Sequence, residues 1–184
     1  MPFIIAFEGI ILVAPLAVTL PRAGNLGGGG FMLVYLAEEN KTIAIDYRET
    51  APLSADRDMF LDPEGNVDNG KARFSAQSSG VPGTVAGLLH VLDQYGTLSI
   101  SEVLKPAIKL ASQGFTINYD LADSLRLSSK RLQQHPSSKK YFYKAQGQYY
   151  LPGDRLVQSD LSRTLKRISK QGSAGFYSGK TAEL

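Results

Sequence analysis

Two apolar runs of strand length, separated by a short polar connection, form the clearest pattern in the chain. The first run covers residues 31–35 (FMLVY) and follows four consecutive glycines at 27–30. The second covers residues 42–47 (TIAIDY) and leads into a polar segment that ends at Pro52. Runs of this length with polar residues at 38–41 between them are typical of paired β-strands. The pattern predicts a β-hairpin entered through a flexible glycine loop.

Side chains along the second predicted strand alternate between two faces. One face carries Ile43, Ile45 and Tyr47, and the other carries Ala44, Asp46 and Arg48. The first face is expected to join the core, whereas the second brings an acid and a guanidinium to the end of a strand. Because a guanidinium can hold a carboxylate through two parallel hydrogen bonds, Arg48 is a candidate ligand contact. The alternative is that Arg48 pairs with Asp46 or Glu49 on a solvated edge.

Farther along the chain, helical spacing and capping residues recur between short polar connections. Ser99 and Glu102 have the spacing of a capping box, Asn118 is a suitable N-cap, and Ser54 precedes a short acidic segment. These signals predict helices over residues 55–61, 80–95, 99–113, 118–134 and 159–171, and an aromatic hairpin over residues 141–151. Helices together with antiparallel hairpins indicate the α+β fold class.

The composition is that of a globular protein with one sizeable core. The chain has 184 residues, of which 43% are hydrophobic and 20% are charged. It contains no cysteine, which excludes disulfides, a thiol nucleophile and thiolate metal ligands. The two histidines, His90 and His135, belong to no metal or catalytic signature. Neither a metal site nor a cofactor is expected.

Two stretches resemble ligand-binding loops but lack the context that such loops need. A phosphate-binding glycine loop follows a strand and opens a helix, whereas the glycines at 27–30 precede a strand. Glycines that permit close backbone approach and positive φ explain this stretch better. The alternating acids of residues 62–68 lack the glutamate and the glycine spacing of a calcium loop. Both stretches are expected to be structural.

Charge is unevenly distributed along the chain. Residues 1–125 contain 8 Lys and Arg against 14 Asp and Glu, whereas residues 126–170 contain 11 against 2. The basic residues are spread over predicted helices and form no groove-reading motif, so neither nucleic acid nor a membrane is an expected partner. A solvated face or a docking surface for an acidic partner is the preferred interpretation.

Five short runs resemble the gamma-glutamyltransferase (gamma-glutamyltranspeptidase, glutathione hydrolase) family in their order and spacing. They are LAVT at 16–19, GNLGGGGF at 24–31, DYRETAP at 46–52, RDMF at 57–60 and GVPGTVAG at 80–87. Together they identify residues 16–184 as a partial large-subunit domain of that family. In the family, the arginine of the third run binds the α-carboxylate of the gamma-glutamyl substrate. The resemblance therefore implies substrate binding by Arg48.

The resemblance also implies a fold and a missing partner. Family members are N-terminal nucleophile hydrolases with a four-layer αββα architecture, to which this chain would contribute a hairpin and several helices. Their nucleophile is a threonine that self-cleavage frees at the start of the small subunit. The Thr-Thr-His run of that site has no counterpart here, so the chain alone is expected to be inactive and to need the missing small subunit.

The first fifteen residues depart from the family pattern. They form an apolar run that contains Glu8 and has no basic residue before Arg22, which does not match a signal peptide. Residues 1–15 are therefore expected to be an atypical amino-terminal segment with no export signal. Family members are generally periplasmic or extracellular, and by resemblance the same location is expected for this protein.

The implied reaction is transfer or hydrolysis of the gamma-glutamyl group of glutathione-like substrates through a threonine glutamyl-enzyme ester. Two alternatives remain open. One is an acylase of the same superfamily that acts on another acyl amide, although the arginine motif favours gamma-glutamyl substrates. The other is a non-catalytic binding or interaction module derived from such a subunit, which the missing nucleophile favours.

Overall fold

Residues 13–184 are described by the computed structural model, and they fall into two units. One unit is residues 25–90, and the other combines residues 13–24 with residues 91–184. The boundary falls within helix α3 (Thr84–Tyr95). The atypical segment expected at residues 1–15 lies mostly outside the described residues, so its boundary stays a prediction.

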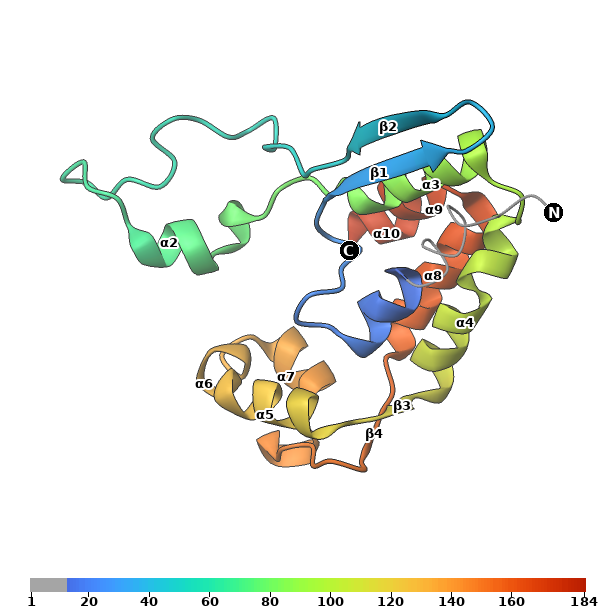
Figure 1. Ribbon diagram of the computed structural model, residues 1–184. Helices are drawn as coiled ribbons and strands as arrows, with labels where there is room; N and C mark the ends of the chain where they lie inside the picture. Colours follow the sequence, from blue (N-terminus) through green and yellow to red (C-terminus); the bar gives the residue numbers. More distant parts are fainter. Residues whose placement is uncertain (1–12) are drawn as a thin grey trace. The chain divides into compact units, whose positions relative to one another are not determined.

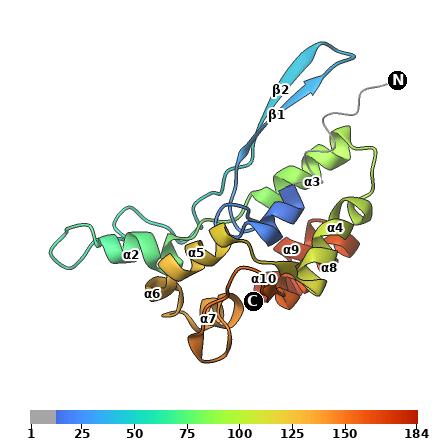
Figure 2. The ribbon, with the colours of Figure 1, turned by 60° about the horizontal axis from the view of Figure 1, so that its bottom comes forward.

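The predicted hairpin is confirmed in the first unit. Strands β1 (Phe31–Leu36) and β2 (Lys41–Asp46) pair antiparallel, with Phe31 opposite Asp46 and Leu36 opposite Lys41 (Figures 1 and 2). The predicted alternation is also present, since Ile43, Ile45 and Tyr47 are half-buried and their neighbours along the strand are exposed. One face of the hairpin therefore packs inward.

The other face of the hairpin is apolar and open. The side chains of Phe31, Leu33 and Tyr35 are 68%, 75% and 56% exposed, whereas Val34 between them is only 3% exposed. In the strand register, Leu33 lies opposite the exposed Ala44. The described residues leave this face without a covering layer.

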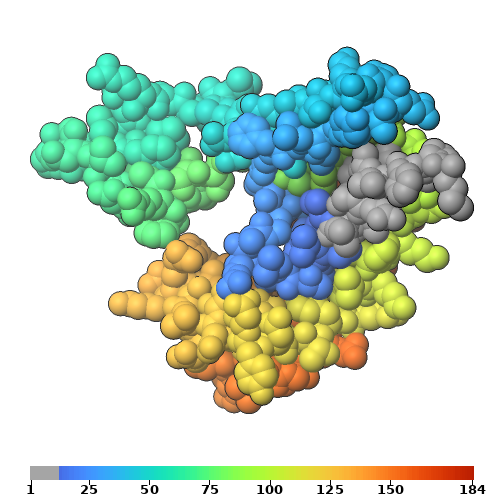
Figure 3. Space-filling model, in the orientation of Figure 1, coloured from blue at the N-terminus to red at the C-terminus, as the bar shows by residue number. Residues whose placement is uncertain are grey.

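After the hairpin, residues 51–79 form an excursion in which no residue is buried. An antiparallel bridge between Thr50 and Val81 joins its two ends. Within it lie α2 (Asn69–Phe74) and a 3-10 turn, η1 (Ala76–Ser78). Figure 3 shows the excursion in teal and green as a lobe beside the blue hairpin. The Thr50–Val81 bridge closes the excursion, and local hydrogen bonds rather than a hydrophobic core hold its shape.

The helix predicted for residues 55–61 is wrong, because these residues form turns. The Oδ1 atom of Asp56 accepts the backbone amide of Asp58 at 2.8 Å. The amide of Leu61 then donates to the carbonyl of Asp58 at 2.9 Å. An aspartate that binds the amide two residues ahead offers the backbone an alternative to helical bonding.

The second unit is mainly helical. Residues 13–19 form a short helix, and α4 (Ile100–Gln113) packs along α8 (Ser159–Gln171). The predicted capping box of α4 is confirmed, since the Ser99 amide donates to Glu102 Oε2 at 2.9 Å and the Glu102 amide donates to Ser99 Oγ. The remaining helices are α5 (Tyr119–Leu127), α6 (Ser129–Leu132), α7 (Pro136–Phe142), α9 (Ala174–Tyr177) and α10 (Gly179–Glu183).

A short strand pair that the sequence did not predict organises the core of this unit. Strands β3 (Phe115–Thr116) and β4 (Arg155–Leu156) pair antiparallel. Leu156 of β4 and Ile117, which follows β3, are almost completely buried against Leu121 and Leu125 of α5. The second unit therefore has a hydrophobic core of its own.

Two predictions between residues 118 and 151 are wrong in their boundaries or type. Asn118 does cap α5, since its Oδ1 accepts the Leu121 amide at 2.8 Å, but the helix ends at residue 127 rather than 134. A separate helix, α7, begins at Pro136, because proline fits the first helical turn. The aromatic hairpin of residues 141–151 is absent, since Tyr143 is buried and its hydroxyl donates to the Leu125 carbonyl at 2.6 Å.

The fold class is confirmed as α+β: several helices accompany two small antiparallel sheets. None of the helices in residues 13–184 combines the length and apolar character needed to cross a bilayer.

Candidate functional site

Arg48 lies two residues beyond the last residue of β2 and is exposed. The Oδ1 atom of Asp46 accepts the backbone amide of Arg48 at 2.9 Å, so this carboxylate orients the Arg48 backbone. Among the described residues, no ion pair or hydrogen bond engages the Arg48 guanidinium. The solvated-edge pair with Asp46 or Glu49 is therefore absent from this part of the chain. Within residues 13–184, the guanidinium has all its donors available.

The backbone around Arg48 is packed closely against glycines from two other segments. A Cβ atom at Gly29 would lie within 3.0 Å of the Arg48 Cα, and one at Gly83 within 3.0 Å of the Tyr47 carbonyl oxygen. A Cβ at Gly87 would meet the Tyr47 side chain just as closely. Real Cβ atoms essentially never approach other atoms at such distances. These three glycines are required for the backbone beside Arg48 to take its place.

A polar clamp joins the glycine loop to the start of α3. The Oδ1 atom of Asn25 accepts two hydrogen bonds, from the Gly28 amide at 3.0 Å and from the buried Thr84 hydroxyl at 2.7 Å. The Gly28 carbonyl in turn accepts the amides of Gly83 at 2.8 Å and Thr84 at 2.9 Å. The two segments that flank the Arg48 backbone are therefore bonded to each other as well.

The glycines at 27–30 serve only one of the two purposes expected of them. None of them has a positive φ, so that part of the expectation is wrong. Close backbone approach is confirmed at Gly29, whereas a Cβ at Gly27 would meet nothing within 4 Å. Within this loop, Gly29 has no room for a side chain, whereas Gly27 does.

The described histidines do not join acidic side chains in a metal-binding cluster. His90 and His135 are both exposed. Across residues 13–184, no group of three or more His, Asp or Glu side chains is placed to hold a metal ion.

The basic side chains of residues 126–170 lie mainly on the surface, and several of them are already paired. Lys144 bonds Asp154 at 2.5 Å, and Lys140 and Arg163 both pair with Asp160. Whether this region is a solvated face or docks an acidic partner stays a prediction.

Arg48 could be named from its motif, but the residues that hold its backbone could not. Asn25 and Thr84 are 59 positions apart, and no local pattern connects them. The one available signal is that both lie in runs that carry the family resemblance, GNLGGGGF and GVPGTVAG.

Comparisons with known proteins agree on one family. The sequence model described as gamma-glutamyltranspeptidase matches residues 10–184. The glutathione hydrolase proenzyme of Escherichia coli K12 is 50% identical over 169 residues, which cover 91% of this chain and 29% of that protein. The crystal structure of Helicobacter pylori gamma-glutamyltranspeptidase is similar with a TM-score of 0.93 and 44% identity, covering 95% of this chain and 50% of that one.

A more distant structure shares the fold alone. Cephalosporin acylase from Bacillus halodurans is 20% identical, with a TM-score of 0.78 over 95% of this chain and 33% of that one. The chain thus spans less than a third of the Escherichia coli relative and half of the Helicobacter pylori chain. The family match includes the segments that contain Arg48 and the glycines around it. The chain therefore belongs to the gamma-glutamyltranspeptidase family.

Proposed function

We propose that this chain is part of a gamma-glutamyltransferase or glutathione hydrolase and that Arg48 binds the α-carboxylate of the gamma-glutamyl substrate. The observation that carries the proposal is an exposed guanidinium with no partner among residues 13–184, on a backbone held by Asp46 and by three close glycines. A solvated guanidinium can exchange its water for a ligand carboxylate and form two charge-assisted hydrogen bonds with it.

The planar guanidinium suits this role because it can donate two parallel hydrogen bonds to one carboxylate. A substrate held in this way has its α-carbon end fixed, so its gamma-carbonyl is presented in a defined direction. A threonine hydroxyl outside this chain would attack that carbonyl and form an ester, and the amine would leave with the transferred proton. Water or a second amine would then take the glutamyl group and restore the hydroxyl.

The small subunit that supplies the threonine is the partner implied by this scheme. Relatives are named proenzymes, which supports a chain that is processed before it acts. A periplasmic or extracellular location follows from the same resemblance.

The isolated 184-residue chain is expected to be inactive, because it contains no threonine at a processed amino terminus and no substitute nucleophile. The measurement is release of the chromophore from a gamma-glutamyl anilide by rigorously purified chain. Turnover that persists through further purification would show that this chain has a nucleophile of its own.

The role of Arg48 is tested in the full-length protein with Arg48→Lys and Arg48→Ala. Both substitutions should reduce kcat/KM for a gamma-glutamyl anilide, at a cost of about 2–5 kcal/mol, because an ammonium keeps the charge but loses the two-point grip. Self-cleavage of the precursor should survive in both variants, since it needs no bound substrate.

The decisive control is a glutaric-acid anilide, which lacks the α-carboxylate. Wild-type protein should prefer the gamma-glutamyl anilide strongly, and both variants should lose that preference. If the ratio of the two kcat/KM values is the same in all three proteins, Arg48 does not read the α-carboxylate. The superfamily alternative, an acylase for another acyl amide, would then become the better interpretation.

A further inference from the structure

The excursion of residues 51–79 contains a pocket that the proposed reaction does not use. The two ends of the excursion are joined by the bridge between Thr50 and Val81, whose two backbone hydrogen bonds measure 3.2 and 2.8 Å. A second bridge joins Leu61 to Val67 inside the excursion. The side chain of Asp68 caps α2 by accepting the Lys71 amide at 2.9 Å. These bonds shape a segment that has no buried residue of its own.

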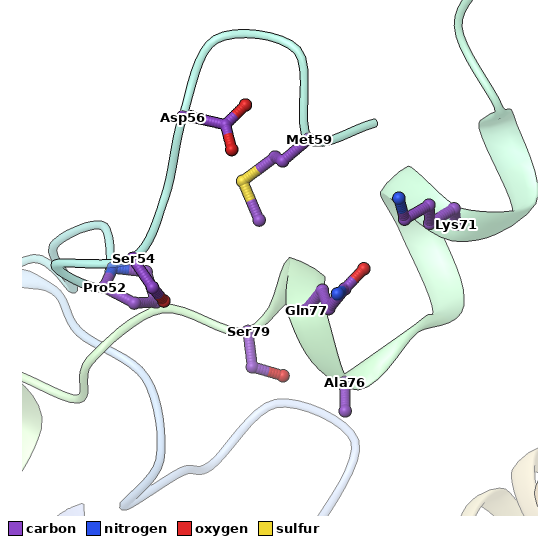
Figure 4. A pocket seen from close by; sticks show the side chains of 8 residues that line it. All are labelled: Pro52, Ser54, Asp56, Met59, Lys71, Ala76, Gln77 and Ser79. Atoms are coloured by element: carbon purple, nitrogen blue, oxygen red, sulfur yellow. The ribbon is translucent and has the colours of Figure 1, made fainter. Parts of the chain in front are cut away.

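The pocket has a volume of about 570 Å³ and lies within this one segment. It is lined by Pro52, Ser54, Asp56, Met59, Lys71, Ala76, Gln77 and Ser79 (Figure 4). Such a volume lies in the range of small-molecule sites. The lining combines one carboxylate, one ammonium, neutral hydrogen-bonding groups and a few apolar side chains.

The two charged side chains of the pocket enter it from opposite walls, Asp56 from the loop and Lys71 from α2 (Figure 4). No ion pair joins them or connects either of them to another described residue. Oδ1 of Asp56 accepts the Asp58 amide, which orients the carboxylate and leaves its second oxygen available. Lys71 is half-buried, whereas the other Lys and Arg residues of the first unit are exposed.

An unpaired ammonium facing an unpaired carboxylate across a pocket is complementary to a molecule that carries both charges. A ligand with a single charge would pair with either Asp56 or Lys71 and leave the other charge partly desolvated without a partner. A ligand with an ammonium at one end and a carboxylate at the other satisfies both through charge-assisted hydrogen bonds. The amide of Gln77 and the hydroxyls of Ser54 and Ser79 can bond the polar groups between the two ends.

We propose that this pocket binds a small zwitterion, a free amino acid or a dipeptide. Asp56 accepts hydrogen bonds from the ligand ammonium, and Lys71 donates to the ligand carboxylate. Met59, Pro52 and Ala76 contact the apolar part of the ligand. The site does not include Arg48, so this proposal and the proposed function succeed or fail separately.

The test is isothermal titration of full-length protein with alanyl-alanine and its two blocked forms, N-acetyl-alanyl-alanine and alanyl-alanine amide. The titrations use an Arg48→Ala background, so that a carboxylate held by that guanidinium is not counted. Each blocked form should bind at least about tenfold more weakly than the free dipeptide, because each loses one charge-assisted bond.

Two variants assign the two ends of the ligand. Asp56→Asn keeps the acceptor for the Asp58 amide but removes the charge, so it should abolish the preference for the free amine over the acetylated form. Lys71→Met keeps the apolar stem, and it should abolish the preference for the free carboxylate over the amide. Thermal unfolding of each variant confirms that the protein is folded before its titration is interpreted.

Matched controls remove the same charges outside the pocket lining. Asp58→Asn lies two residues from Asp56, and Arg73→Gln lies on the same helix as Lys71. Both controls should bind the free dipeptide as the parent protein does. No binding up to about 10 mM, equal affinities for the three dipeptides, or the same losses in the controls would overturn the proposal.

Discussion

At the scale of single residues, the Arg48 backbone can take its place because the residues next to it are glycines, which have no side chain. A Cβ atom at Gly29 would overlap the Arg48 Cα, and a Cβ atom at Gly83 would overlap the Tyr47 carbonyl. Asn25 then binds the glycine loop to the first residue of α3 through its Oδ1 atom. An exposed guanidinium with no partner among residues 13–184 thus extends from a backbone that is packed closely between two other segments.

A comparison of two alanine substitutions in the same loop tests this account. In the full-length protein, Gly29→Ala should destabilise by about 1–3 kcal/mol, because the added methyl group forces the Arg48 backbone to shift. It should also reduce kcat/KM for a gamma-glutamyl anilide. Gly27→Ala meets nothing within 4 Å and should be neutral or stabilising by about 0.4–1 kcal/mol. Equal effects of the two substitutions would show that the loop tolerates a side chain at either position.

At the scale of elements, a turn held by charged hydrogen bonds lies directly before β4 and positions that strand for pairing with β3. Asp154 Oδ2 accepts the Leu151 amide at 2.6 Å and pairs with Lys144 at 2.5 Å. The hydrogen bond from Lys144 and then that from the Leu151 amide hold the pKa of Asp154 below its usual value. A carboxyl group with a lowered pKa in the folded state contributes stability above the unfolded pKa and loses it as the pH falls through the folded pKa.

This turn should therefore weaken in acid. Asp154→Asn should speed amide hydrogen exchange in residues 151–156 at neutral pH, and the difference from wild type should shrink as the pH falls below the usual range of aspartate. Asp123→Asn is the control, because Asp123 pairs with Arg126 on the exposed surface of α5, 3.2 Å away. A difference in residues 151–156 that stays constant from neutral pH to strong acid would contradict the assigned role of the Asp154 charge.

At the scale of the whole molecule, the open face of the hairpin is the feature most expected to make the isolated chain self-associate. Three large apolar side chains on β1 are more than half exposed, and an exposed two-stranded sheet also offers unpaired edges. The isolated 184-residue chain is therefore expected to self-associate at concentrations where a well-covered domain stays monomeric. Light scattering after size-exclusion chromatography measures this.

The face responsible can be identified by one substitution and its control. Leu33→Thr introduces a β-branched residue, which suits a strand, while removing the large apolar side chain, and it should reduce self-association. Leu53→Thr makes the same change at a fully exposed position outside the hairpin and should have little effect. A monomeric wild-type chain, or equal effects of both substitutions, would show that the hairpin face does not drive association.

Several local features followed from the sequence because they depend on residues only a few positions apart. The alternation of β2, the capping box of Ser99 and Glu102, and the cap of Asn118 on α5 each involve neighbours within one turn or one pleat. The alternation and the caps are set by backbone geometry, so they can be recognised without knowing what packs against them. The role of Arg48 toward the substrate came instead from the family resemblance of the DYRETAP run.

Only the tertiary structure decided the features that join distant segments. Phe115 pairs with Leu156, the Tyr143 hydroxyl reaches Leu125, and Asn25 meets Thr84 across 59 positions. Residues 141–151, predicted as an aromatic hairpin, instead bury Tyr143 and form no strand pair. Gly29 has no room for a Cβ atom and Gly27 does, although the two look alike in sequence. The physical reason is that steric approach and burial depend on which other segment arrives at a residue, and no local pattern records that.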